Sequence, residues 1–190
     1  MPHPETEDFK WLAEQAANCS KIVEIGSLYG ASARAMLDNS AAHLWCIDSW
    51  RGSDTKPKRG FVSTEEHFQT FLENISDVRE RVTVLKMYSR GAVGLLPAQS
   101  FDLVFIDADH SYDAVRFDIQ HFAPLVKPGG ILCGHDYGPK PMRNGLIRAV
   151  NELIKEPKEA GEMIWWTQRE PGWLGEFDVY GNENYVYVTD

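Results

Sequence analysis

The sequence has no uninterrupted apolar run of about 18 residues, the length at which a membrane-spanning helix is expected. Its acidic first residues also lack the apolar core of a signal peptide. The three cysteines, Cys19, Cys46 and Cys133, are far apart and have no metal-binding spacing. An odd, scattered set of thiols suits a reducing compartment. We therefore expect a cytoplasmic protein without a membrane partner, in which the cysteines are packing residues.

Basic residues are scarce relative to acidic ones, with 19 Lys and Arg against 28 Asp and Glu and a net charge of -9. Nucleic-acid binding depends mainly on basic surface, so no nucleic-acid partner is expected. One local basic cluster, Lys56, Lys58 and Arg59, lies in a polar stretch at 50–63. It is either a solvated loop or a lid that attracts an anionic acceptor to a binding site.

No repeat, low-complexity tract or inter-domain linker divides the chain, and we expect a single domain over residues 1–190. Apolar segments of strand length alternate with segments of helical periodicity. This alternation predicts an α/β fold with a Rossmann-like, doubly wound sheet. Closely spaced strands after the last helix predict that an antiparallel C-terminal hairpin closes a mostly parallel, seven-stranded sheet.

The expected elements follow from this alternation and from the turn residues between them. Strands are expected at 21–26, 43–48, 81–86, 101–107, 130–135, 162–168, 173–180 and 184–189. Helices are expected at 7–18, 30–39, 64–77, 90–96, 111–123 and 143–155.

The first expected strand runs through the acidic Glu24 into a turn that contains Gly26 and Gly30 and leads directly into a helix. A second acidic strand end follows at Asp48. Such a turn lets the backbone approach a charged small molecule at a helix N-terminus, which predicts a nucleoside-bearing cofactor. The G-x-G-x-x-G spacing typical of dinucleotide dehydrogenases is missing. Because Glu24 would lie near a pyrophosphate, a cofactor with an ammonium group fits better.

Four segments of the chain carry a family resemblance. They are Glu24–Ser32 (EIGSLYGAS), Asp48, Phe101–Asp109 (FDLVFIDAD) and Lys127–Gly130 (KPGG). In this order they resemble the motif series of class I S-adenosylmethionine-dependent methyltransferases. Each motif is degenerate alone, but the ordered set is specific and extends over most of the chain. The resemblance implies that the cofactor is S-adenosylmethionine.

The resemblance also implies a role for individual residues. Glu24 and the glycine turn would face the methionine end of the cofactor, and Ser32 would bond its carboxylate. Asp48 would accept hydrogen bonds from both ribose hydroxyls. Asp107 would lie beside the sulfonium. The full expected cofactor set is Glu24, Gly26, Ser27, Tyr29, Gly30, Ser32, Asp48, Ser49, Trp50, Ser89, Arg90 and Asp107, with Ser89 and Arg90 at the adenine. If the 50–63 stretch is a lid, Trp50 packs against the adenine as part of it.

The acceptor side is expected where the fourth and fifth strands end. Adjacent parallel strands bring Asp107 within about 5 Å of the end of the fifth strand, which carries His135 and Asp136. Carboxylates that converge there can hold Mg²⁺, so the expected metal ligands are Asp107, Asp136 and His135. His110 is the expected catalytic base, with His135 as its rival. Alternatively, His135 and Asp136 only fix the loop.

The Asp-Ala-Asp-His and His-Asp-Tyr segments resemble a methyltransferase branch that includes sugar O-methyltransferases of antibiotic pathways. In that branch, an Asp at each of these two strand ends binds Mg²⁺ and a His acts as the base. This chain departs from the pattern, because it has His135-Asp136 where metal-dependent relatives often have Asp-Asp or Asp-Asn. The departure puts the metal and its third ligand in doubt.

These observations predict a methyltransferase that acts on a small-molecule acceptor, at a hydroxyl, with the assistance of Mg²⁺. Three alternatives stay open: a metal-independent enzyme acting on a nitrogen or a carboxylate, an NAD-dependent oxidoreductase, and a non-catalytic cofactor-binding module. The aromatic C-terminal segment packs on the sheet, lines the acceptor pocket or forms a dimer face, so a homo-oligomer also stays open.

Overall fold

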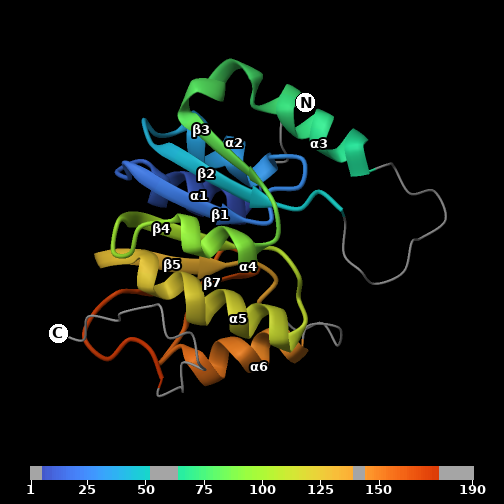
Figure 1. Ribbon diagram of the computed structural model, residues 1–190. Helices are drawn as coiled ribbons and strands as arrows, with labels where there is room; N and C mark the ends of the chain where they lie inside the picture. Colours follow the sequence, from blue (N-terminus) through green and yellow to red (C-terminus); the bar gives the residue numbers. More distant parts are fainter. Residues whose placement is uncertain (1–5, 52–63, 139–143, 176–190) are drawn as a thin grey trace.

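The computed structural model describes residues 6–51, 64–138 and 144–175, and within them it contains a seven-stranded sheet flanked by helices (Figure 1). The strands are β1 (Lys21–Ile25), β2 (His43–Asp48), β3 (Val82–Lys86), β4 (Phe101–Ile106), β5 (Val126–Gly134), β6 (Lys158–Ala160) and β7 (Ile164–Gln168). The α-helices are α1 (Glu7–Ala16), α2 (Ala31–Asp38), α3 (Thr64–Asn74), α4 (Ser89–Ala92), α5 (Tyr112–Phe122) and α6 (Asn144–Leu153). Short 3-10 helices are η1 (Ser76–Arg81), η2 (Val93–Leu95) and η3 (Ala123–Leu125).

The strand order is β3-β2-β1-β4-β5-β7-β6, which confirms the predicted mostly parallel, seven-stranded sheet. Strands β1 to β5 pair in parallel, whereas β7 is antiparallel to both β5 and β6. The chain reverses its direction of winding between β1 and β4. Ligands of open α/β sheets bind at such a switch point, outside the carboxyl ends of the strands.

Helices cover both faces of the sheet, as a doubly wound fold requires (Figure 1). Two buried clusters fill the layers between the sheet and the helices. Ile22 of β1 packs with Leu12 of α1 and Met36 of α2 on one face. Its neighbour Val23 packs with Ile119 of α5 on the other face, because successive strand residues point to opposite sides. None of the helices that the structure describes has the length and apolar character needed to cross a membrane.

The closing hairpin is built from β6 and β7, and the sequence prediction missed β6. Its residues Lys158 and Glu159 are polar and exposed, so they give no strand signal. In the predicted strand 173–180, the described part makes only an isolated bridge, between Leu174 and Ile154. The rest of that strand, the predicted strand 184–189 and most of the proposed lid at 50–63 lie outside the described residues.

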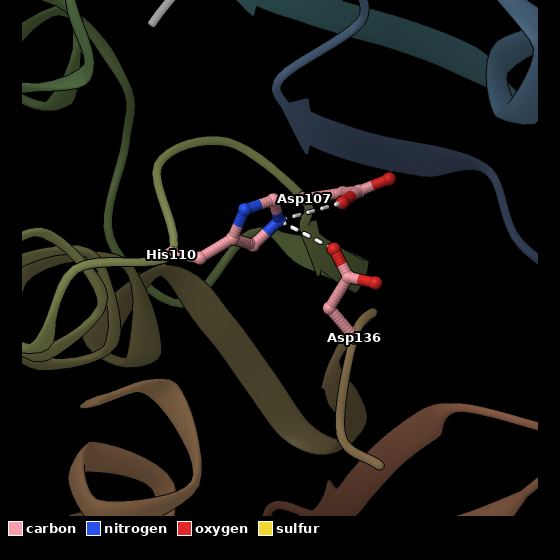
Figure 2. Close-up of side chains that lie close together, drawn as sticks. All are labelled: Asp107, His110 and Asp136. Carbon is pink, nitrogen blue, oxygen red and sulfur yellow. Dashed lines mark ion pairs between the residues drawn. The ribbon is translucent and has the colours of Figure 1, made fainter. Parts of the chain in front are cut away.

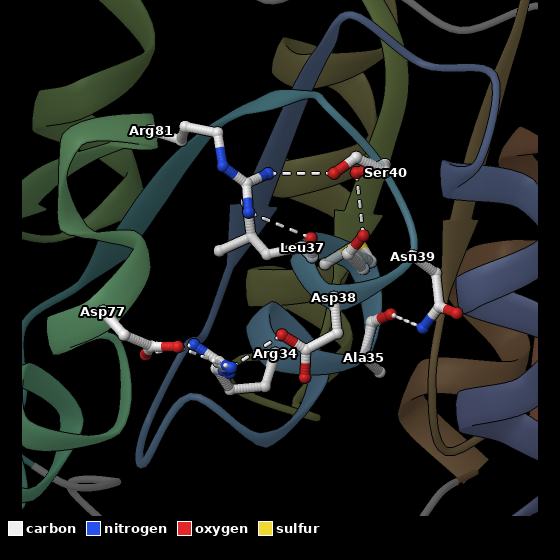
Figure 3. Close-up of polar contacts among 9 residues, drawn as sticks. Arg34, Ala35, Leu37, Asp38, Asn39, Ser40, Asp77 and Arg81 are labelled. Atoms are coloured by element: carbon white, nitrogen blue, oxygen red, sulfur yellow. Dashed lines mark hydrogen bonds and ion pairs between the residues drawn. The ribbon is translucent and has the colours of Figure 1, made fainter.

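Helix α2 follows the glycine turn, and its C-terminal end is anchored to η1 (Figure 3). The Arg81 guanidinium donates hydrogen bonds to the carbonyls of Leu37 at 3.1 Å and Ser40 at 3.0 Å. Arg34 forms ion pairs with Asp38 of the same helix and with Asp77 of η1. The Arg81 hydrogen bonds satisfy carbonyls that the end of a helix leaves without partners, and together with the Arg34 ion pairs they fix α2 relative to η1.

Candidate cofactor and acceptor site

A cavity of about 660 Å³ lies at the carboxyl edge of the sheet, beside the switch point. Most of the predicted cofactor residues line it. They are Gly26, Ser27, Tyr29, Ser32, Asp48, Ser49, Trp50, Ser89, Arg90 and Asp107, joined by His110. Glu24, Gly30, His135 and Asp136 do not line it. Its volume is within the range of about 300–1,000 Å³ that is usual for small-molecule sites.

The glycine turn joins three strand ends. Gly26 donates its N–H to the Ile47 carbonyl at 2.8 Å, and Asp107 donates its N–H to the Ile25 carbonyl at 2.8 Å. Gly26 has φ +93°, and a Cβ at this position would overlap the backbone carbonyl of Asp107. Only glycine therefore lets the β1 turn approach the end of β4 this closely.

Glu24 lies behind the turn and not on the cavity, which corrects the prediction that it faces the methionine end of the cofactor. Its side chain is fully buried, with 0% exposure. The Ser27 hydroxyl donates to one carboxylate oxygen at 2.5 Å, and the Ser32 hydroxyl donates to the other. Burial raises the pKa of Glu24 to about 7 despite these hydrogen bonds. Glu24 therefore holds the turn and the first residues of α2 in place.

Asp48 lines the cavity at the end of β2, as predicted. Its two oxygens accept backbone N–H groups, one from Leu28 at 2.9 Å and the other from Trp50 at 2.7 Å. A carboxylate oxygen can accept more than one hydrogen bond, so both oxygens retain capacity for hydroxyl donors. The two N–H groups fix the orientation of the carboxylate toward the cavity.

Trp50 is part of the cavity wall, but its ring is only 1% exposed. The ring packs against Phe68 and Phe71, with centroids 4.7 and 4.8 Å away, and its Nε1–H donates to the Leu28 carbonyl at 2.7 Å. The prediction that Trp50 packs against adenine therefore needs correction. Its indole belongs to the core and stabilises the glycine turn through the hydrogen bond to Leu28.

Asp107, His110 and Asp136 come together from the ends of β4 and β5 (Figure 2). The His110 Nε2 lies 2.5 Å from Asp136 Oδ2 and 3.7 Å from Asp107 Oδ1. The carboxylates of Asp107 and Asp136 raise the pKa of His110 to about 9. Although burial opposes ionisation of Asp136, His110 and His135 hold its pKa well below the usual value. At neutral pH the ring of His110 is therefore a cation between two carboxylates.

In the part of the chain that the structure describes, the residues that could hold a metal ion are Asp107, His110 and Asp136, whose potential ligand atoms lie within 4.8 Å of one another. The expected ligand set had His135 in place of His110. His135 is turned away from this group: its Nε2 lies 3.2 Å from Asp8 Oδ2, and its Nδ1 lies 3.4 Å from Asp136 Oδ1. His135 thus contacts one oxygen of Asp136, whereas His110 contacts the other, and His135 does not line the cavity as a predicted ligand or base would.

Two buried acids near the site were not predicted. Asp8 of α1 is 4% exposed and accepts backbone N–H groups from Glu162 and Met163, at 2.7 and 3.0 Å. Asp118 of α5 is 3% exposed and lines the cavity. Helical spacing places each acid on the apolar face of its helix, and that mismatch is the signal that could have identified both.

Comparisons with known proteins identify a family and a shared fold. Residues 23–137 match a protein family described as "Methyltransferase domain". A comparison with curated proteins found no significant match. Among solved structures, the chain is similar to an O-methyltransferase from Bacillus cereus in complex with SAH, with 17% identity, TM-score 0.62 and coverage of 85% of this chain and 80% of that one.

Two further solved structures are similar at comparable levels. The O-methyltransferase NovP has 18% identity and a TM-score of 0.62, with coverage of 86% of this chain and 78% of that one. An SAH-bound methyltransferase from Podospora anserina has 15% identity and a TM-score of 0.61, with coverage of 84% and 76%. At these identities the structures show a shared fold. Because the family match extends over more than half of the sequence, the chain belongs to the methyltransferase domain family, of the class I S-adenosylmethionine-dependent type that its motifs resemble.

Proposed function

We propose that this protein transfers the methyl group of S-adenosylmethionine to a hydroxyl group of a small-molecule acceptor. The observation that carries the proposal is a single cavity lined by Asp48, by Asp107 and by His110. Asp48 suits the ribose hydroxyls of the donor, and the pair at the end of β4 offers a carboxylate and an imidazole to an acceptor. The similarity to solved O-methyltransferases supports the choice of a hydroxyl.

Methyl transfer needs little covalent chemistry from the protein, because the sulfonium is already activated. The chain must place the donor, align the acceptor oxygen with the methyl group and remove the hydroxyl proton. In our proposal, Asp48 fixes the ribose, and Ser89 and Arg90 lie at the adenine. The methyl group then faces Asp107 and His110, so the acceptor binds at that end of the cavity.

His110 is the proposed base. Its pKa of about 9 means that it is protonated at neutral pH while it bridges Asp107 and Asp136. An imidazolium cannot accept a proton, so the base form appears as pH rises or when another positive charge occupies the carboxylates. Turnover is therefore expected to increase with pH until the ring is neutral.

The carboxylates of Asp107 and Asp136 fit Mg²⁺, which prefers oxygen ligands and binds through one or two carboxylates and several waters. We propose these two residues as its ligands. When bound, the ion would supply positive charge that lowers the pKa of an acceptor hydroxyl. Its charge would also favour the neutral form of His110.

A second candidate is a metal-independent methyltransferase that acts on a nitrogen or a carboxylate. The observation that favours it is the 2.5 Å contact between His110 and Asp136, because the imidazolium already neutralises the site in which a metal would bind. Chelation separates the two candidates. If the enzyme uses Mg²⁺, EDTA abolishes turnover and Mg²⁺ restores it. A Mg²⁺-dependent rise in melting temperature that Asp136→Asn removes gives a readout independent of activity.

The experiment that tests the proposal measures methylation of a panel of small-molecule alcohols, phenols, amines and carboxylic acids. We expect turnover with a hydroxyl acceptor, and His110→Ala to lower kcat by about 100-fold or more while affinity for S-adenosylhomocysteine stays within about threefold. His43, whose Nε2 contacts the Thr83 hydroxyl far from the cavity, provides the control His43→Ala. Binding of S-adenosylhomocysteine without turnover on any acceptor would instead indicate a non-catalytic module.

A further inference from the structure

Asp118 is a buried carboxylate that the proposed mechanism does not use. It lies on the buried face of α5 with Val115 and Ile119 and is 3% exposed. The Ser89 hydroxyl hydrogen-bonds to the carboxyl group, but Asp118 Oδ1 has no hydrogen-bond partner among the described residues. Nearly all buried polar atoms in native proteins have a partner, so this oxygen calls for one from outside the chain.

The surroundings of Asp118 indicate what kind of partner this is. Asp118 lines the cavity together with Ser89, Arg90 and Phe117. The Arg90 guanidinium lies over the Phe117 ring, 4.2 Å from its centroid, and forms a flat, partly aromatic wall beside the carboxyl group. These residues come from α4 and α5, which lie next to each other (Figure 1). A flat surface beside a hydrogen-bond acceptor suits a planar base that carries an amino group.

We propose that Asp118 recognises the adenine of the methyl donor, with Oδ1 accepting a hydrogen bond from the exocyclic amino group at C6. This inference rests on the proposed function, because it assigns a specificity determinant within the donor site. Ser89 holds the other side of the carboxyl group and so orients Oδ1 toward the base. Asp118 is thus a residue that selects adenine, in addition to Asp48, which meets the ribose.

Both protonation states of Asp118 are compatible with this role. Burial raises its pKa to about 7, so the carboxyl and carboxylate forms coexist near neutral pH. The ionised form accepts from the amino group, and the protonated form can also donate to N1 of the same edge. A 6-oxo purine places a carbonyl oxygen where the amino group was. That oxygen faces Oδ1, so the site should reject it.

The experiment is a calorimetric comparison of S-adenosylhomocysteine with S-inosylhomocysteine, whose base has a carbonyl oxygen at C6 in place of the amino group and carries a proton on N1. We expect the unmodified protein to bind the adenosyl compound at least about 30-fold more tightly. The isosteric Asp118→Asn carries an amide that can either accept or donate, so the preference should fall below about threefold. Glu14→Gln on α1 is the matched control, because it also replaces a carboxylate by an amide, at an exposed residue that does not line the cavity, and it should leave the preference unchanged.

The possible outcomes separate this inference from the proposed function. If S-adenosylhomocysteine binds but the unmodified protein does not discriminate between the compounds, the role of Asp118 is overturned and the donor site stands. The role of Asp118 is also overturned if Asp118→Asn lowers the affinity for both ligands by the same factor, as substitution of a purely structural residue would. If the unmodified protein binds neither compound, both the inference and the proposed function fail. The comparison of the two compounds with the unmodified protein needs no variant, so it tests the inference even if Asp118→Asn does not fold.

Discussion

Asp48 and Glu24 are acids near the ends of neighbouring strands, but only Asp48 lies on the cavity. Both oxygens of each acid accept a hydrogen bond from the protein, but Asp48 faces the cavity, whereas Glu24 is fully buried against Ser27 and Ser32. Residue type and position in a strand therefore do not decide whether an acid binds a ligand or supports the backbone. Access of the carboxylate to the cavity decides it.

At the residue scale, the first prediction concerns Asp48. We expect Asp48→Ala to weaken binding of S-adenosylhomocysteine about 10- to 100-fold, because hydrogen bonds to a charged group contribute about 1.5–3 kcal/mol. Titration calorimetry measures the change. Asp48→Asn keeps one carbonyl acceptor, so its affinity should lie between those of the unmodified protein and the alanine variant. An unchanged affinity for the alanine variant would remove Asp48 from the donor site.

The second prediction at this scale concerns the buried carboxyl group of Glu24. Its pKa is raised from 4.5 to about 7 in the folded protein, so the native state binds more protons than the unfolded state between these values. Its contribution to stability is complete below pH 4.5 and is lost as pH rises to about 7, by on the order of 3 kcal/mol.

Urea unfolding at pH 5 and pH 8 measures this effect. Glu24→Gln cannot ionise, so its stability relative to the unmodified protein should improve on going from pH 5 to pH 8. Exposed Glu14 on α1 provides the control Glu14→Gln, for which no such change is expected. An identical pH dependence in the unmodified protein and in Glu24→Gln would show that Glu24 is ionised in the fold.

At the scale of elements, the β1 turn and the end of β4 can approach each other only if residue 26 has no side chain. Gly26 and Gly129 both have positive φ, at +93° and +76°, but a Cβ at Gly129 would meet nothing within 4 Å. Gly129→Ala therefore measures the backbone strain alone, and Gly26→Ala adds the overlap with Asp107. We expect the Gly26 variant to lose about 1–3 kcal/mol more unfolding free energy than the Gly129 variant.

Thermal or urea unfolding of both variants tests this prediction, and S-adenosylhomocysteine affinity gives a second readout. Gly26→Ala should also weaken binding of S-adenosylhomocysteine, because the turn that contains Gly26 lines the cavity. Gly129→Ala should not, because Gly129 does not line it. Equal losses in the two variants would mean that the close approach to β4 is not a constraint.

The elements were largely predictable, because apolar periodicity and turn residues determine them locally. Strand β2 has the predicted bounds, and most of the other strands and helices differ by a few residues at their ends. Strand β5 begins at Val126, before the predicted residue 130, because pairing with Phe101 extends it across the Lys-Pro-Gly-Gly segment. Strand β6 was missed because its pairing with β7, and not its own sequence, makes it a strand.

The position of a site residue was predictable where the backbone decides it and not where the direction of the side chain does. Asp48 and Asp107 are at strand ends, so the topology alone places them on the cavity. The burial of Glu24 and Trp50, and the choice of His110 over His135 beside Asp107, depend on contacts between residues far apart in the sequence. Asp8 and Asp118 went unnoticed because an acid on a helix is usually solvated.

At the scale of the whole molecule, the sheet order brings the ends of β1, β2 and β4 to one edge and leaves the cavity between them. In our proposal, a nucleoside that bridges Asp48 and the end of β4 spans this switch point, with its adenine toward Asp118 and its sulfur toward Asp107. The arrangement predicts one binding direction for the donor and leaves the acceptor at the β4–β5 end.

A crystal structure of the complex with S-adenosylhomocysteine tests this arrangement most directly. We expect the ribose hydroxyls within hydrogen-bonding distance of the Asp48 carboxylate and the sulfur atom facing Asp107 and His110. A ligand bound elsewhere, or one whose adenine lies against Asp107 while its sulfur lies at Ser89, would contradict it.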